Sequence, residues 1–336
     1  MRVYITGAAG FIGFHLAKIL LEEGITVHGM DGMTDYYDVS LKRARLAILN
    51  QTPGFSFTEC MLEDNQTLGA DIAAFRPDAI VHLAAQAGVR YSLEAPRSYL
   101  SANIDGTFNV MEAARELGVQ HLLLASTSSV FGANTDMPYR ETDKVDTQVS
   151  LYAATKKATE NLSHAYAHLW SIPTTCFRFF TVYGPWGRPD MAPFKFTKAI
   201  LAGDVIDVYG QGDMFRDFTY VTDLVRAIRL LIDAAPVRPE GPDGIEAGDS
   251  LSPVAPWRVV NIGNGDKVAL GDFIAAIEAA TGKQARKNFM DMQKGDVRAT
   301  WADNGLLRRL TGYQPETDIR AGMSAFVRWY RDYYHL

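Results

Sequence analysis

The feature that most constrains the fold is a set of closely spaced glycines between an expected strand and an expected helix at the start of the chain. The apolar run 3–5 is β-prone and stops at Thr6-Gly7, and apolar residues then recur at helical spacing from Phe11 until Gly24. The same alternation continues, with strands expected at 26–30, 79–83, 122–125, 174–180 and 259–263 and helices at 103–117 and 152–170. Strands that are apolar throughout and alternate with helices are typical of a parallel sheet covered on both faces. The sequence therefore predicts an α/β fold with a doubly wound parallel sheet.

Composition excludes several other classes of protein. The 336 residues include 33 Lys+Arg and 39 Asp+Glu, a net charge of −6, which argues against nucleic acid as the main partner. No apolar run approaches the roughly 20 residues that span a bilayer, so no membrane partner is expected. Cys60 and Cys176 are too few for a disulfide framework or a metal cluster. We therefore expect a cytoplasmic enzyme.

The glycines form a dinucleotide-binding fingerprint. Gly7 permits a tight turn, Gly10 lets the backbone approach a pyrophosphate, and Gly13 allows close helix–strand packing, while the helix N-terminus offers N–H groups to the phosphates. Asp31 ends the second expected strand, where a carboxylate binds ribose hydroxyls and repels a 2′-phosphate, so NAD is favoured over NADP. A turn or helix-capping role for Asp31 is the alternative. The small residues of 83–88 follow another strand and let the chain pass close to the cofactor, although a simple loop is a competing interpretation.

A tyrosine and a lysine carry the expected chemistry. Tyr152 and Lys156 are spaced i and i+4, which places a phenol and an ammonium on one helix face. A free tyrosine titrates near pH 10, and a nearby ammonium together with the positive nicotinamide of NAD⁺ would lower that pKa. A solvated helical pair is the alternative. The hydroxyl-rich run 126–129 at the end of an expected strand favours a catalytic role.

With these motifs in place, the sequence resembles an extended short-chain dehydrogenase/reductase, and within that family the nucleotide-sugar 4-epimerases. The resemblance implies a Rossmann-type domain and a smaller C-terminal α/β substrate-binding domain, with 1–182 and 217–266 in the first and 183–216 and 267–336 in the second. It implies that Tyr152 is the general base and acid, that Lys156 holds the nicotinamide ribose, and that Thr127 bonds the sugar O4. The NAD-binding positions that it implies are Gly7, Gly10, Phe11, Ile12, Gly13, Asp31, Leu62, Leu83, Ala84, Ala85, Gln86, Asn103, Tyr152, Lys156 and Phe180.

Two longer motifs, 84–91 and 180–192, resemble UDP-glucuronate 4-epimerases. Oxidation of a glucuronate at C4 gives a β-keto acid that loses CO₂ easily, so an epimerase must hold the carboxylate in a plane that denies the breaking bond overlap with the ketone. Short hydroxyl donors and a basic residue can do this. The candidates on these grounds are Ser128, Ser129, Thr181 and Arg188, with Arg90 as a further one. The resemblance implies the other substrate-binding positions: Thr127 at the sugar O4, Tyr209 at the uracil with Val208 before it, Arg216 at the diphosphate, and Asp296. Strand-end or turn roles remain the alternative for the serines and for Arg188.

Three departures from the family pattern concern the surroundings of the site. Met61-Leu62 replaces the Asp-hydrophobic pair that usually contacts adenine, Gly32 stands where asparagine commonly follows the acid, and Phe131 replaces a usual tyrosine. These changes weaken individual contacts without removing the catalytic residues.

The expected reaction is NAD-dependent inversion at C4 of a UDP-uronic acid through a 4-keto intermediate without decarboxylation. The alternatives are a UDP-glucose/UDP-galactose 4-epimerase, a UDP-glucuronate decarboxylase, and a non-enzymatic NAD-sensing protein on the same fold. Thr181 stands where the neutral-sugar enzymes typically have asparagine, and the glutamate of the decarboxylases is missing near Ser128. A homodimer is expected from the resemblance. No metal is expected, and we interpret His164 and His168 as structural.

Overall fold

The computed structural model describes residues 1–241, 244–293 and 297–336. Its centre is a seven-stranded sheet in the order β11-β6-β5-β4-β1-β2-β3, and every neighbouring pair is parallel. The strands are β1 (Arg2–Thr6), β2 (Thr26–Asp31), β3 (Phe55–Glu59), β4 (Ala79–His82), β5 (His121–Thr127), β6 (Thr174–Phe179) and β11 (Trp257–Ile262). The predicted doubly wound α/β fold is confirmed. The strand and helix over 55–75 are additions to the elements expected from the sequence.

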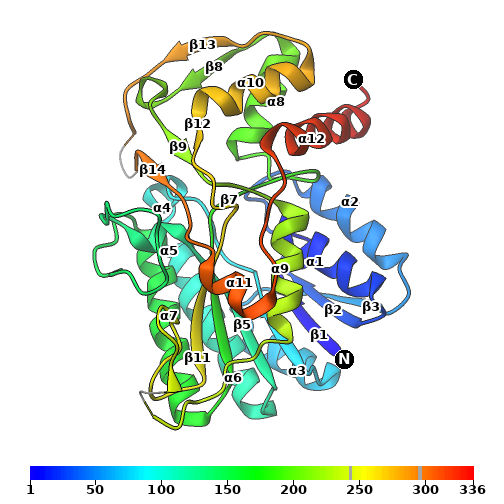
Figure 1. Ribbon diagram of the computed structural model, residues 1–336. Helices are drawn as coiled ribbons and strands as arrows, with labels where there is room; N and C mark the ends of the chain where they lie inside the picture. Colours follow the sequence, from blue (N-terminus) through cyan, green and yellow to red (C-terminus); the bar gives the residue numbers. More distant parts are fainter. Residues whose placement is uncertain (242–243, 294–296) are drawn as a thin grey trace.

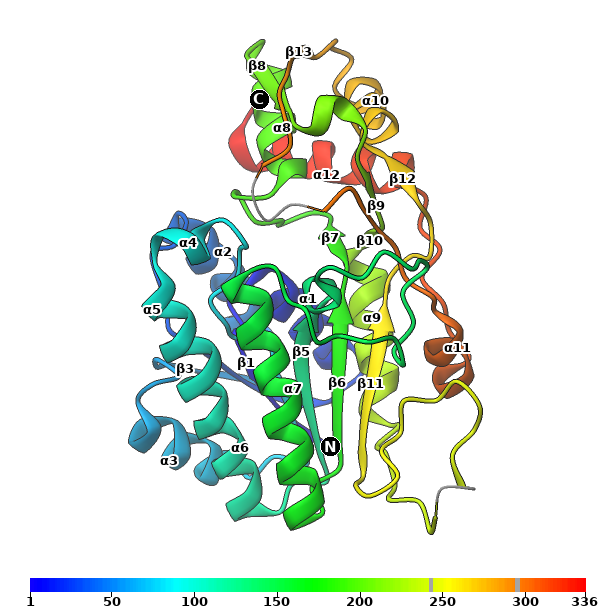
Figure 2. The same ribbon diagram turned by 90° about the vertical axis from the view of Figure 1, so that its left-hand side faces the viewer.

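Helices cover both faces of this sheet, and alternate residues of each strand supply the two cores. The helices are α1 (Phe11–Glu22), α2 (Val39–Asn50), α3 (Asn65–Phe75), α6 (Gly106–Leu117), α7 (Leu151–Trp170), α9 (Val221–Ile232) and α11 (Gly305–Thr311). One apolar cluster joins Val3 and Ile5 of β1 to α1 and α9, and another joins Tyr4 to α3, α6 and α7. Figure 2 shows α6 and α7 on one side of the sheet and α9 and α11 on the other.

A second group of elements lies beyond the ends at which the strands of the sheet finish (Figure 1). Its helices α8 (Ala192–Ala202), α10 (Leu270–Thr281) and α12 (Ile319–Tyr334) share a core that includes Phe194, Phe273 and Phe326. Its strands are β7 (Thr181–Tyr183), β8 (Val205–Val208), β9 (Phe215–Arg216), β10 (Phe218–Tyr220), β12 (Val268–Ala269), β13 (Arg286–Phe289) and β14 (Ala299–Thr300). The division of the chain into two domains at the predicted boundaries stays a prediction.

The helix expected at 103–117 begins differently from a regular α-helix. The short helices α4 (Tyr91–Glu94) and α5 (Pro96–Tyr99) lead into a π-helical stretch, η1 (Leu100–Asp105), and only then into α6. Such wide turns occur mostly at functional sites, and this one carries Asn103. Two 3₁₀ turns, η2 (Ser128–Phe131) and η3 (Gly210–Gly212), complete the described elements.

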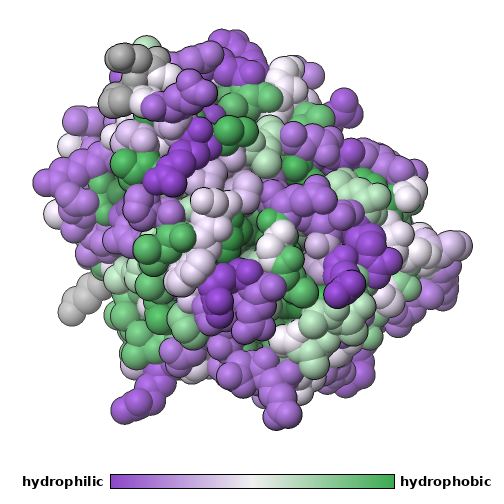
Figure 3. All heavy atoms as spheres, turned by 90° about the horizontal axis from the view of Figure 1, so that it is seen from below, coloured by the Kyte–Doolittle hydropathy of each residue, from purple (hydrophilic) through white to green (hydrophobic). Residues whose placement is uncertain are grey.

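Apolar and hydrophilic side chains are interspersed on the surface of the protein. Seen from below, where the strands begin, apolar residues lie in small areas between hydrophilic ones (Figure 3). Among the described residues no helix combines the length and the apolar character needed to cross a membrane.

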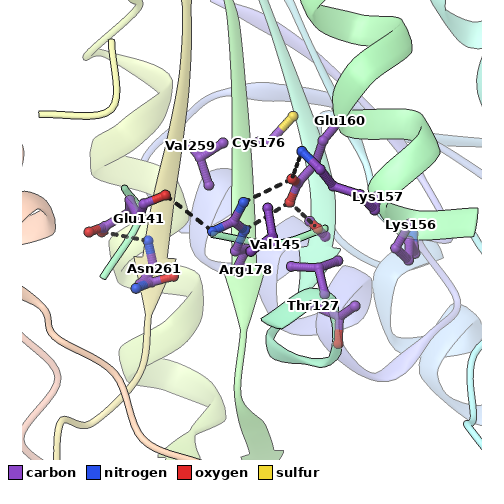
Figure 4. Close-up of polar contacts among 12 residues, drawn as sticks. Thr127, Glu141, Val145, Lys156, Lys157, Glu160, Cys176, Arg178, Val259 and Asn261 are labelled. Atoms are coloured by element: carbon purple, nitrogen blue, oxygen red, sulfur yellow. Dashed lines mark hydrogen bonds and ion pairs between the residues drawn. The ribbon is translucent and has the colours of Figure 1, made fainter. Parts of the chain in front are cut away.

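A buried ion pair fixes α7 to the sheet directly below the carboxyl end of β5. Arg178 of β6 donates from Nε and Nη2 to the two carboxylate oxygens of Glu160, both at 2.9 Å, and neither side chain is more than 2% exposed. Ser126 Oγ donates to the same carboxylate at 2.6 Å, and Arg178 also donates to the backbone oxygen of Glu141. Figure 4 shows Arg178 between the two glutamates. Because α7 carries the predicted tyrosine and lysine, this pair sets their distance from β5.

Replacing Glu160 tests how much the fold depends on this network. Glu160→Gln leaves the Arg178 guanidinium buried without a carboxylate, so we expect the free energy of unfolding to fall by about 3–5 kcal/mol. Urea denaturation measures the change. The matched control is Glu22→Gln, which breaks an exposed ion pair with Lys18 and should cost less than about 1 kcal/mol. Equal effects of the two substitutions would contradict a structural role for the buried pair.

Candidate active site

Two adjoining cavities open at the carboxyl ends of the central strands. The glycine-side cavity, of about 230 Å³, is lined by the glycine turn after β1, by Asp31 and by Lys156. The hydroxyl-side cavity, of about 300 Å³, is lined by Thr127 and its neighbours. Tyr152 and Arg188 belong to the walls of both cavities. The two cavities therefore share a wall, which also includes Phe11, Ile12, Ala87, Ser126 and Phe179.

The glycine turn has the space that a dinucleotide requires. Gly7 adopts φ +74°, and a Cβ there would lie 2.9 Å from the backbone nitrogen of Ala84. A Cβ on Gly13 would lie 2.1 Å from the Gly7 oxygen, so α1 can approach the turn only with glycine at this position. The cavity continues from this turn along Leu83–Gln86 to the end of β2. This cradle fits NAD, whose phosphates would face the N-terminus of α1.

Asp31 sits where the ribose of the cofactor is expected, and it has a cationic neighbour. Its Oδ1 accepts from the backbone N–H of Met33 at 2.8 Å and from Lys42 Nζ at 3.2 Å. Both charged side chains are less than 10% exposed and both line the cavity. The turn role and the cavity role of Asp31 thus coexist, because one carboxylate oxygen orders the turn while the side chain borders the cavity.

Asn103 holds the loop that forms the inner wall of the glycine-side cavity. Its Oδ1 accepts from the Gln86 N–H at 2.8 Å, and its Nδ2 donates to the Gln86 oxygen and to Thr155 Oγ1, both at 3.0 Å. Asn103 is fully buried and does not itself line either cavity. The π-helical stretch therefore positions this amide between the loop and α7.

Tyr152 and Lys156 lie at the inner end of the glycine-side cavity. Burial raises the pKa of the Tyr152 phenol, while a hydrogen bond with Thr127 and the charge of Arg188 lower it. Lys156 Nζ donates to the backbone oxygen of Ala125 at 2.9 Å, and burial lowers the pKa of this ammonium to about 8. Burial thus outweighs the other two effects on the phenol in the protein alone. The lowering of its pKa by Lys156 together with the nicotinamide of NAD⁺ stays a prediction.

Hydroxyl groups and a cation line the other cavity. Thr127 ends β5 and its Oγ1 accepts from the Ser129 N–H at 3.2 Å, and Ser128, Ser129 and Thr181 share the same wall. Arg188 binds Asp190 through two hydrogen bonds, Nε to Oδ1 at 3.0 Å and Nη2 to Oδ2 at 2.6 Å. Burial alone would lower the pKa of the Arg188 guanidinium, but Asp190 outweighs it and the pKa is raised. The cavity thus presents neutral donors and a permanent positive charge.

The remaining predicted substrate residues are distributed around this cavity. Arg216 lines it, whereas Arg90, Val208 and Tyr209 do not. The Arg90 guanidinium lies 5.0 Å from the centre of the Tyr209 ring, and Val208 is buried in the core of the second group of elements. Phe180, predicted at the cofactor, lines the hydroxyl-side cavity. Asp296 lies outside the described residues.

Comparison with known proteins agrees with this geometry. Residues 3–242 match the NAD dependent epimerase/dehydratase family. The chain belongs to this family. It is 52% identical over 334 residues to a probable UDP-glucuronate 4-epimerase of Rhizobium meliloti (strain 1021), with 99% of this chain and 98% of the relative covered. It is 43% identical to UDP-glucuronate 4-epimerase 4 of Arabidopsis thaliana, with 99% and 76% covered.

Solved structures of the family resemble this fold closely. The UDP-glucuronic acid 4-epimerase of Bacillus cereus, in complex with UDP-glucuronic acid and NAD, superposes with a TM-score of 0.86 at 31% identity, and 99% of this chain and 100% of that one are covered. A UDP-glucose 4-epimerase of Thermotoga maritima, with UDP-glucose, gives 0.84 at 27% identity, with 99% and 100% covered. The cofactor of this epimerase/dehydratase is NAD.

Sequence reasoning missed three side chains of this family member's site. Tyr36 and Lys42 line the glycine-side cavity, and Asp190 binds both Arg188 and the Tyr36 hydroxyl. Lys42 lies eleven residues after Asp31, inside what becomes α2, and no motif marks it as a partner of the acid. The acid two residues after Arg188 was visible in the sequence, yet its pairing with the arginine depends on the turn that the proline of this segment imposes.

The structure also shows what Phe131 and the histidines of α7 contact. Phe131 is fully buried and stacks on Tyr139 with ring centres 4.1 Å apart, so the departure from tyrosine serves the core. His164 bonds Ser252 Oγ and His168 bonds the Val254 oxygen, both at 2.8 Å. The two histidines thus attach α7 to the 250–256 segment.

Removal of the Asn103 amide should weaken the cofactor site of this epimerase/dehydratase. Asn103→Ala leaves the Gln86 N–H buried without its acceptor, so we expect a loss of about 1–3 kcal/mol in unfolding free energy and a weaker hold on NAD. Urea denaturation and the fraction of NAD retained after gel filtration measure the two effects. Asn65→Ala, at an exposed position of α3, is the control. Unchanged retention in Asn103→Ala would refute the anchoring role.

Proposed function

We propose that this protein is a UDP-glucuronate 4-epimerase, which interconverts UDP-glucuronate and UDP-galacturonate through a 4-keto intermediate without loss of CO₂. The observation that carries the proposal is the position of Tyr152 in the wall that the two cavities share, with the glycine cradle on one side, the hydroxyls on the other and Arg188 in the same shared wall. The full-length identity to a probable UDP-glucuronate 4-epimerase and the likeness to a complex with UDP-glucuronic acid and NAD support it.

In the proposed reaction, each residue where the two cavities meet has its own role. The glycine cradle would hold NAD, which would supply the hydride acceptor and donor for C4. Tyr152 accepts the O4 proton as C4 is oxidised and returns it after the sugar has turned its other face, and Thr127 hydrogen-bonds the same oxygen. General acid–base catalysis of this kind contributes roughly 10²–10⁴ in rate. Burial raises the pKa of the Tyr152 phenol, and the positive charge of an oxidised nicotinamide beside it would act in the opposite direction and favour the phenolate.

The hydroxyl-side wall explains how the carboxylate is retained. The 4-keto intermediate is a β-keto acid, and decarboxylation requires the C–C bond to align with the ketone. In our proposal Ser128, Ser129 and Thr181 donate hydrogen bonds to the carboxylate and Arg188 balances its charge. Asp190 holds the Arg188 guanidinium in place through two hydrogen bonds.

Two alternatives predict different products. The likeness to a UDP-glucose 4-epimerase keeps a neutral-sugar substrate as the second candidate, and a decarboxylase would use the same oxidation. Incubation with UDP-glucuronate followed by NMR of the product separates them. UDP-galacturonate without CO₂ supports the proposal, a UDP-pentose indicates a decarboxylase, and no reaction together with turnover of UDP-glucose indicates the neutral-sugar enzyme.

Tyr152→Phe should abolish turnover while the bound NAD remains. The substitution removes only the hydroxyl that moves the proton, and the ring still fills its place beside the cavity. Product NMR measures activity and the absorbance of released nucleotide measures cofactor content. Substantial epimerisation by the variant would exclude Tyr152 as the base.

Arg188→Met should discriminate between charged and neutral sugars. The loss of a charge-assisted contact predicts an affinity for UDP-glucuronate that is lower by roughly 10- to 100-fold, with a much smaller change for UDP-glucose. Calorimetry on the holoenzyme measures both, and Arg140→Met at an exposed site is the control. Equal weakening of the two ligands would show that Arg188 does not contact the carboxylate.

We also propose a cytoplasmic homodimer. Cys60 and Cys176 are free buried thiols, which accords with a reducing compartment. Apolar side chains are exposed on η1, α6 and α7, where Phe108 and Trp170 both contact the ring of Tyr166 and Leu169 is 65% exposed. A second copy of the chain packed along α6 and α7 would bury them.

Sedimentation analysis tests the dimer. We expect twice the mass of 37.1 kDa for the wild type and a shift toward monomer for Trp170→Glu. Val237→Glu, in a loop at a 77% exposed position, should remain dimeric. A wild type that sediments as a monomer would disprove the proposed assembly.

A further inference from the structure

The space around position 32, rather than its backbone conformation, requires a glycine there. Its φ lies outside the left-handed region, so its backbone would accept a side chain. A Cβ built on Gly32, however, would lie 2.5 Å from Met61 Sδ, and the next nearest atom, the oxygen of Cys60, is 3.4 Å away. The thioether of Met61 therefore occupies the volume that a side chain at position 32 would need.

This contact lies at the outer end of the glycine-side cavity. Gly32 follows the last residue of β2, Met61 lies two residues after β3, and the Cys60 N–H donates to the Asp31 oxygen at 3.2 Å. Both Gly32 and Met61 line the cavity, and Met61 is 43% exposed, so a ligand can reach its side chain. In a dinucleotide site the pyrophosphate lies on the glycine turn and the ribose on the acid that ends β2. The adenine base therefore belongs beyond Asp31, toward β3.

We propose that Gly32 and Met61 act as one unit that binds the adenine of NAD, in which the thioether, seated over Gly32, packs against the base. A methionine sulfur is polarizable and makes favourable contacts with aromatic rings, and it needs no hydrogen-bonding partner in the base. The inference rests on the proposed use of NAD and adds the residues that hold its adenosine end.

The pair makes a specific prediction about position 32. An added Cβ at Gly32 displaces the end of a flexible, partly exposed side chain, so the fold tolerates it. The displaced thioether no longer covers the base. Gly32→Ala should therefore leave the stability of the fold unchanged while it weakens the retention of NAD. A purely structural role for Gly32 predicts no such difference.

Exchange of bound NAD for radiolabelled NAD in the purified holoenzyme tests the pair. We expect Gly32→Ala and Met61→Ala each to speed release by about 3- to 10-fold, and the double variant to release NAD no faster than Met61→Ala. Unfolding midpoints in urea should stay at the wild-type value. Gly69→Ala, where a Cβ meets nothing within 4 Å, and Met292→Ala, at an exposed position outside both cavities, should leave release unchanged.

The outcomes are distinct. Single variants that leave release unchanged, or a double variant whose effect is the product of the two single effects, would overturn the pair while the NAD site stands. A wild-type protein that neither retains nor exchanges NAD would overturn the proposed function, and this inference with it.

Discussion

The close approach of the glycine turn to its neighbours is the constraint on which the rest of the structure depends. Because Gly7 and Gly13 carry no side chains, α1 packs against the turn and the turn packs against the end of β4. That packing leaves a cradle at the carboxyl ends of the strands, where α1 presents its N-terminus. Tyr152 reaches the inner end of this cradle because the buried pair of Glu160 and Arg178 holds α7 to the sheet. The glycine cradle and the phenol that we propose to be catalytic are thus fixed by two separate contacts.

Each of two cations in the site is paired with a carboxylate, and this pairing determines how the cation can interact with a ligand. Lys42 faces Asp31 at the adenosine end, and Arg188 faces Asp190 between the cavities. Each of these two cations is held in place by a carboxylate. Lys156 differs, since its Nζ donates to the backbone oxygen of Ala125 and burial lowers the pKa of its ammonium to about 8. A negative charge that arrived beside this ammonium would raise that pKa again.

Sequence patterns predicted the parallel sheet, the glycine turn and the placement of Tyr152 on a helix, because period and spacing are local properties. They did not predict Lys42, Asp190 or the π-helical stretch before α6, because these depend on how distant segments meet. Tyr152 and Lys156 show the same limit. A spacing of four residues places two side chains on one helix face, but it reveals neither the burial that raises the pKa of the Tyr152 phenol nor the hydrogen bond from Lys156 to the Ala125 oxygen.

The roles of Gly32 and Met61, at the adenosine end of the cavity, cannot be judged one position at a time. From the sequence, Gly32 and Met61 read as two unrelated losses of polar contact, each of which weakens the hold on NAD. In three dimensions the sulfur of one fills the space left by the other, so each change is intelligible only in the presence of its partner. A family can in this way exchange a hydrogen-bonded adenine contact for a packed one while the ribose acid, the turn and the catalytic tyrosine keep their places. Restoring one polar residue alone would leave either a clash or a gap, because the two positions share one volume.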